Sequence, residues 1–164
     1  MIHSKIIKRL SLLLLFCSLF VSAKASYIFI PMDESQSNHL KAYGIAYYAI
    51  ERDVKVDWLL NYQGGSFMIK YHSIIENECN IRGVSFTIIA DIQSTQILQS
   101  ISSPSVNQDV VRLEKAPKIA IYSPKSKQPW DDAVTMALTY AEIPYEVVYD
   151  EEVLSNLLPL YDWL

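Results

Sequence analysis

The stretch that decides the fold runs from Lys118 to Tyr149 and reads KIAIY-SPKSKQPWDDAVTMALTYAEIP-YEVVY. Two β-type apolar runs, Lys118–Tyr122 and Tyr145–Tyr149, flank a segment that opens near Pro129, a residue suited to the first turn of a helix. A strand, a helix and a second strand in this order predict parallel strands joined by a crossover. The helix is indicated by apolar residues at steps of three and four: Trp130, Ala133, Val134, Ala137, Leu138 and Ala141.

A second passage of the same kind lies earlier in the chain. Tyr27–Pro31 predicts a strand, Asn38 can cap a helix that reaches about Arg52, and Val54–Leu60 predicts the next strand. The apolar stripe of this helix is Leu40, Tyr43, Tyr47 and Ile50. Further helices are predicted at Ser73–Ile81, Asp91–Ser102 and Glu151–Leu157, and further strands at Ser66–Ile69, Val84–Ala90, Val110–Leu113 and Leu160–Leu164.

This alternation predicts an α/β fold with a mainly parallel, Rossmann-like sheet and flanking helices. The chain has 164 residues, 51% of them hydrophobic and 20% charged, which suits one domain with a real core. An irregular stretch at residues 102–117 marks a possible internal boundary. The strand-type run at Leu160–Leu164 is followed by no helix, which predicts that the domain continues beyond Leu164.

The first 25 residues have the pattern of a secretory signal. Lys5, Lys8 and Arg9 precede the apolar run Leu10–Val21, and small residues follow it up to Ala25. The apolar run is too short for a membrane span of about 20 residues. The sequence therefore predicts export through the Sec pathway to the periplasm or medium, cleavage after Ala25, and no stable membrane insertion.

Cleavage changes the charge and thiol content of the chain. Residues 26–164 keep all 18 acidic but only 10 of the 14 basic side chains, so the net charge moves from −4 to −8. A strongly acidic protein repels phosphate backbones, and nucleic acid is not expected as a partner. Cys79 is the one thiol left. The glycine-rich motifs of nucleotide sites and the histidine spacing of metal sites are missing, so no cofactor or metal is expected.

Polar residues after predicted strands are the candidate binding residues, because an open parallel sheet binds ligands beyond the carboxyl ends of its strands. Asp33 and Glu34 follow the first strand. A mixed cluster follows the strand at Lys118–Tyr122, where basic and aromatic side chains can hold an anionic or sugar-like group. Its members are Ser123, Lys125, Lys127, Trp130 and Asp131. A small polar ligand is therefore expected, although the same residues also suit a solvated loop and a helix N-terminus.

Three long segments carry a resemblance to a known family: Ile30–Gly44, Asp57–Phe67 and Lys115–Asp132. With them the chain resembles exported bacterial proteins commonly named asparagine synthetase B, and the part from Lys118 is similar to the start of a class I glutamine amidotransferase-like domain. The resemblance implies that fold and an amide-transferring or amide-hydrolysing enzyme. No catalytic residue carries over, since Ile2 replaces the N-terminal cysteine nucleophile and no elbow cysteine occurs.

Three functions remain open on the sequence alone. The first is a binding protein for a small polar ligand at the strand ends. The second is an amidotransferase-like enzyme whose nucleophile lies beyond Leu164. The third is an interaction protein of the cell envelope, suggested by the tyrosine-rich helix face of Tyr43, Tyr47 and Tyr48.

Overall fold

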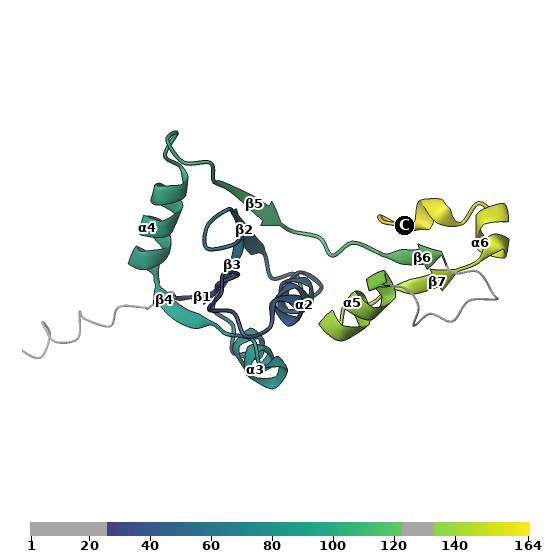
Figure 1. The fold of residues 1–164 in the computed structure, drawn as a ribbon, viewed down its shortest axis with the longest axis horizontal. Helices are drawn as coiled ribbons and strands as arrows, with labels where there is room; N and C mark the ends of the chain where they lie inside the picture. Colours follow the sequence, from purple (N-terminus) through teal and green to yellow (C-terminus); the bar gives the residue numbers. More distant parts are fainter. Residues whose placement is uncertain (1–25, 123–132) are drawn as a thin grey trace, which may run out of the picture.

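The computed structural model describes residues 26–122 and 133–164 (Figure 1). Residues 26–113, called the sheet lobe, form a five-stranded sheet with three helices. Its strands are β1 (Ser26–Ile30), β2 (Val56–Leu60), β3 (Ser66–Lys70), β4 (Thr87–Ala90) and β5 (Asp109–Leu113). Its helices are α2 (His39–Ile50), α3 (Ser73–Arg82) and α4 (Asp91–Ile101). These elements follow the order predicted from the sequence.

The prediction of a mainly parallel, Rossmann-like sheet, which the resemblance to a class I glutamine amidotransferase-like domain also implied, is wrong. The strand order is β4-β1-β3-β2-β5, and every neighbouring pair is antiparallel. Strands β1 and β2 do run in the same direction, but β3 lies between them and pairs with both. The first four strands and two helices have the βαββαβ order of a split βαβ, or ferredoxin-like, unit. Strand β5 extends that unit beside β2.

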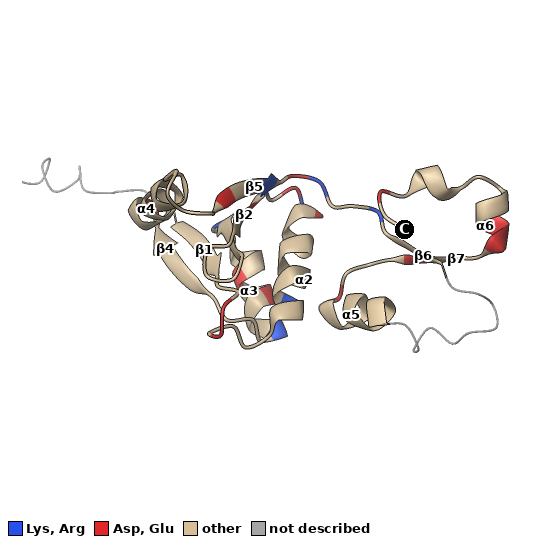
Figure 2. Ribbon diagram, turned by 45° about the horizontal axis from the view of Figure 1, so that its top comes forward, with Lys and Arg blue, Asp and Glu red and all other residues tan. Residues whose placement is uncertain are grey.

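Helices cover both faces of this sheet, and each face has its own core. Alternate residues of a strand point to opposite faces, so Ile28, Ile30 and Phe67 pack toward α2 and α3. Phe29 and Leu59 pack on the other face with residues of α4. Figure 2 shows α4 and the α2–α3 pair on opposite sides of the strands. The sheet lobe therefore has three layers.

The β2–β3 hairpin fixes the position of the loop that follows β1. Gly64 has a φ of +78°, and a Cβ at this residue would lie 2.2 Å from the carbonyl oxygen of Met32. The Met32 N–H donates to the carbonyl of Gln63 at 3.0 Å. Glycine is required at position 64 because both its backbone angle and this close approach exclude a side chain.

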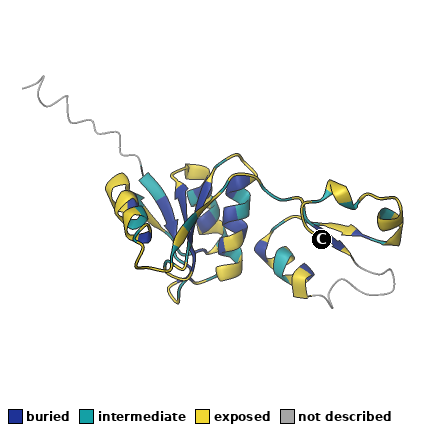
Figure 3. Cartoon of the chain, turned by 90° about the horizontal axis from the view of Figure 1, so that it is seen from above, coloured by how far each residue is buried: buried dark blue, intermediate teal, exposed yellow. Residues whose placement is uncertain are grey.

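Residues 118–122 and 133–164 form a smaller unit, called the C-lobe. It contains β6 (Ala120–Tyr122), α5 (Ala133–Ala141), β7 (Glu146–Val148) and α6 (Asp150–Leu154). Strands β6 and β7 are parallel, as their strand–helix–strand pattern predicts, and Trp163 forms a parallel bridge with Ile119. An extended segment joins the two lobes, and buried residues gather mainly in the sheet lobe (Figure 3).

Three predictions of burial need correction. The apolar pattern of Val84–Ala90 is typical of a buried strand, but this stretch contains β4 at the edge of the sheet, where Ile88 is exposed. Of the stripe expected on α5, Ala141 is buried but Val134 is exposed, and the other buried residue of the helix, Thr135, is not in the stripe. This stripe is only partly buried because α5 packs closely on α2 near the C-terminal end of α5, at Ala141. On α2, Ile50 of the expected stripe is buried in the core, but Leu40 and Tyr43 are exposed. The rest of the core face is made by Ala42, Ile45, Ala46 and Ala49.

Within residues 26–122 and 133–164, no helix is long and apolar enough to cross a membrane.

Candidate functional site

The loop after β1 holds the first two predicted site residues, Asp33 and Glu34. The Asp33 carboxylate accepts hydrogen bonds from the backbone N–H of Ser35 at 3.0 Å and from its hydroxyl at 2.6 Å. These bonds lower the pKa of Asp33. His39 Nε2 lies 3.1 Å from the carbonyl oxygens of Met32 and Asp33. The polar groups around Asp33 thus contact one another, while Glu34 is exposed.

The sequence predicts that the remaining candidate site residues share a sheet edge with this loop. Ser123, Lys125, Lys127, Trp130 and Asp131 lie outside the described residues. The strands that precede the two clusters, β1 and β6, belong to separate sheets. A shared sheet edge therefore does not bring the clusters together, and a polar ligand at the strand ends stays a prediction.

A pocket of about 440 Å³ lies between the lobes, and we call it the interlobe pocket. Helix α2 and the sheet provide one wall, and the segment after β5 and the C-lobe provide the other. Its aliphatic lining includes Ile50, Leu113, Ile119 and Ile143. Five aromatic residues line it as well: Tyr43, Tyr47, Trp58, Phe67 and Trp163.

The aromatic rings of the sheet lobe support one another. Trp58 stacks on Phe67 with ring centroids 6.3 Å apart and an interplanar angle of 28°. Tyr43 meets Phe67 edge to face at 5.4 Å. Both arrangements are favourable for aromatic pairs. The wall formed by these rings is therefore held in place before any ligand enters.

The polar groups of two pocket residues form hydrogen bonds within the protein. The Trp58 indole N–H donates to the carbonyl of Gly65 at 3.0 Å. The Tyr47 hydroxyl donates to the carbonyl of Pro117 at 2.9 Å, which ties α2 to the segment between the lobes. Burial of the Tyr47 ring, with the negative charges of Glu51 and Asp162, raises the pKa of this phenol. These two residues therefore offer mainly apolar surface to the pocket.

One ion pair lies at the pocket. Lys115, a lining residue, places Nζ 3.2 Å from Asp162 Oδ1. The other carboxylate oxygen of Asp162 accepts from the backbone N–H of Lys118 at 2.8 Å, and this hydrogen bond lowers the pKa of Asp162. Figure 2 shows the basic residues on the segment between β5 and β6.

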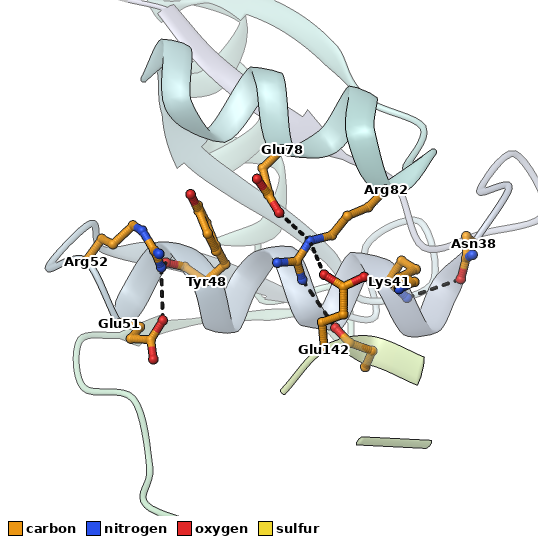
Figure 4. Close-up of polar contacts among 9 residues, drawn as sticks. Asn38, Lys41, Tyr48, Glu51, Arg52, Glu78, Arg82 and Glu142 are labelled. Atoms are coloured by element: carbon orange, nitrogen blue, oxygen red, sulfur yellow. Dashed lines mark hydrogen bonds and ion pairs between the residues drawn. The ribbon is translucent and has the colours of Figure 1, made fainter. Parts of the chain in front are cut away.

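A cluster of charged residues joins α5 to α2 and α3 on the sheet lobe (Figure 4). Glu142, just after α5, forms ion pairs with Lys41 of α2 and Arg82 of α3, with 3.1 Å between Arg82 Nε and Glu142 Oε2. Arg82 Nε also donates to Glu78 Oε1 at 2.7 Å. The hydrogen bond from Lys41, and the charges of Arg82 and Lys41, lower the pKa of Glu142.

Cys79 lies on α3, on the side of the helix that faces the core, and is fully buried. Burial, with the nearby charge of Glu78, raises the pKa of its thiol to about 12. A thiolate is the nucleophilic form of cysteine, so this environment opposes nucleophilic chemistry. Cys79 is instead a packing residue of the core.

We expect the Cys79 thiol to be unreactive in the folded protein. In the full chain with Cys17→Ser, Ellman's reagent at about pH 8 should react at least about 100-fold more slowly than in the same chain unfolded by urea, because access and thiolate formation are both suppressed. Rapid stoichiometric reaction of the native chain would show instead that α3 opens readily.

No group of three or more histidine, cysteine, aspartate or glutamate side chains in the described part of the chain could hold a metal ion. No protein-family model, curated protein or solved structure matches the chain. The relation to the proteins named asparagine synthetase B, and the amidotransferase chemistry that it implies, therefore stay predictions.

Sequence reasoning did not find the interlobe pocket. It gave Tyr43 and Tyr47 as part of an apolar stripe, and it noted that tyrosines gather on this helix. The structure places these two tyrosines at the pocket rather than in the core, whereas Ile50 of the same stripe is buried. The signal that could have found the site is a pair of tyrosines, with partly polar rings, on a helix whose core face is already formed by alanines and isoleucines.

Proposed function

We propose that this protein binds a small, planar and largely apolar ligand in the interlobe pocket. The proposal rests on a wall of mutually packed rings, Tyr43, Phe67 and Trp58, in a pocket that Trp163 of the C-lobe also lines. Small-molecule sites are mostly apolar clefts of about 300–1,000 Å³ at boundaries between structural units. The pocket volume of about 440 Å³ lies in that range.

The chemistry of the lining narrows the ligand class. The indole N–H of Trp58 and the hydroxyl of Tyr47 are already bonded to backbone carbonyls, so the ligand gains chiefly from ring contact. Among the described residues, Lys115 is the positively charged residue of the lining, and its partner Asp162 is exposed. A planar ring system with one acidic group fits both features, because its anion can replace Asp162 as the partner of Lys115.

The test uses the full chain with Trp130→Phe, so that the two remaining tryptophans, Trp58 and Trp163, both line the pocket. An anilinonaphthalene sulfonate probe, which combines planar rings with an anion, should bind saturably and quench their fluorescence. Replacement of Trp163 by alanine should weaken binding about tenfold, equivalent to about 1.4 kcal/mol, because one wall of the pocket is lost.

Leu154→Ala is the matched control. Leu154 belongs to the same lobe, is 85% exposed and does not line the pocket. Its removal should leave the dissociation constant unchanged. Equal weakening by the two substitutions, or binding that does not saturate, would show that the probe adheres to exposed apolar surface and would overturn the proposal.

A further inference from the structure

The end of α5 is seated in a recess on the sheet lobe. Gly44 of α2 has no side chain, and a Cβ at this position would lie 1.8 Å from the carbonyl oxygen of Ala141. Arg82 Nη1 donates to the same carbonyl at 3.3 Å. A helix C-terminus carries partial negative charge on its free carbonyls, so a guanidinium is a favourable partner there. The contact is therefore both close and electrostatically matched.

Glu142 adds a charged contact directly after this helix end. Its φ is +59°, and its carboxylate pairs with Lys41 and Arg82, which belong to the other lobe. The Arg82 side chain is only 7% exposed, and Glu78 of its own helix also pairs with it. Arg82 therefore keeps a partner when Glu142 is removed, so loss of Glu142 breaks a contact between lobes without leaving a buried charge unpaired.

The turn that contains Glu142 also contributes a lining residue to the interlobe pocket. Ile143, the residue after Glu142, is one of the pocket's lining residues from the C-lobe. A displacement of Glu142 from Lys41 and Arg82 therefore also shifts Ile143 and changes the lining of the pocket.

We propose that Lys41, Arg82 and Glu142 form an electrostatic latch that holds the C-lobe on α2 and so controls ligand retention in the interlobe pocket. The effect on ligand retention rests on the proposed function, whereas the latch itself does not. Lys41 belongs to α2 and Arg82 to α3, and Figure 4 shows the side chains of both residues directed at Glu142. Ionic strength is then the natural control on the site, because the Glu142 side chain is 48% exposed and its ion pairs are open to screening.

The experiment compares two charge reversals in the full chain with Trp130→Phe. Glu142→Lys places a positive charge against Lys41 and Arg82 and should open the lobes. Glu51→Lys is the control, because Glu51 is also 48% exposed and pairs with Arg52 of its own segment rather than across the lobes. Acrylamide quenching of Trp58 and Trp163 reports opening without any ligand, and titration with the anilinonaphthalene sulfonate probe reports binding.

We expect Glu142→Lys to raise the quenching constant at least about twofold and to weaken probe binding at least about threefold, while Glu51→Lys changes neither. Salt at about 1 M should raise the quenching constant of the parent chain toward that of Glu142→Lys, since the Debye length falls to about 3 Å and the ion pairs are screened. Unchanged quenching in Glu142→Lys would overturn the latch. Increased quenching with unchanged probe affinity would overturn its control of the pocket. Increased quenching in a chain whose parent never binds the probe would support the latch and overturn the proposed function.

Discussion

Replacement of Phe67 by alanine should lower the free energy of unfolding by about 3–5 kcal/mol. Phe67 lies on the central strand β3, is 1% exposed and packs between Trp58 and Tyr43. The substitution removes its buried apolar surface, leaves a cavity under α2 and ends both ring contacts. Domains of this size are stable by about 5–15 kcal/mol, so this one change removes a large part of the total. Urea unfolding followed by circular dichroism measures the loss.

Phe86→Ala is the matched control for this prediction. This substitution removes the same kind of ring from the margin of the same core, where Phe86 is only partly buried. Its loss should cost less than half as much, because less apolar surface leaves water and the site can relax. Equal losses for the two variants would contradict the central position that the structure gives to Phe67.

Local signals in the sequence predict the elements well because their physical causes are local. The side chain of Asn38 accepts from the backbone N–H of Lys41 and caps α2, as predicted. Gly83 ends α3 in the left-handed conformation, with a φ of +66°. Each of these effects depends on a few neighbouring residues, so a reader of the sequence has all of the information that determines them.

The order of the strands was missed because it depends on the hairpin between β2 and β3. A strand, a helix and a strand predict that β1 and β2 run in the same direction, and they do. They do not show whether another strand lies between them. The five-residue turn Asn61–Gly65 contained that information, since so short a connection forces β3 to return antiparallel beside β2. Strand β3 then fills the space beside β1, which leaves β4 at the edge.

The interlobe pocket could not be predicted from sequence for a different reason. Its walls come from Tyr43, Phe67, Ile119 and Trp163, which are far apart in the chain, and each of them is an ordinary core residue when taken alone. Only the docking of the C-lobe on α2 brings them around one space. That docking depends on a glycine at one point of contact, and a glycine within a helical pattern carries no information about its partner.

Replacement of Gly44 by alanine tests that docking directly. In an ordinary solvent-exposed helix this change stabilises by about 0.5–1 kcal/mol, because glycine is a poor helix former. Here we expect the opposite effect on the contact between lobes. The new Cβ would lie 1.8 Å from a backbone oxygen of Ala141 and 3.1 Å from Arg82 Nη1. Since a backbone carbonyl cannot rotate away as a side chain can, α5 must leave its place on α2.

The readouts for Gly44→Ala separate loss of docking from loss of folding. Quenching of Trp58 and Trp163 by acrylamide should rise in the Trp130→Phe chain, while the circular dichroism of the folded state stays unchanged. Gly83→Ala is the control, since position 83 has a φ of +66° and no atom within 4 Å of the added Cβ. It should lower stability by about 1–2 kcal/mol through backbone strain alone and leave the quenching unchanged. If Gly44→Ala instead stabilises the chain without greater quenching, the helices do not meet at Gly44, and both the interlobe pocket and its latch lose their structural basis.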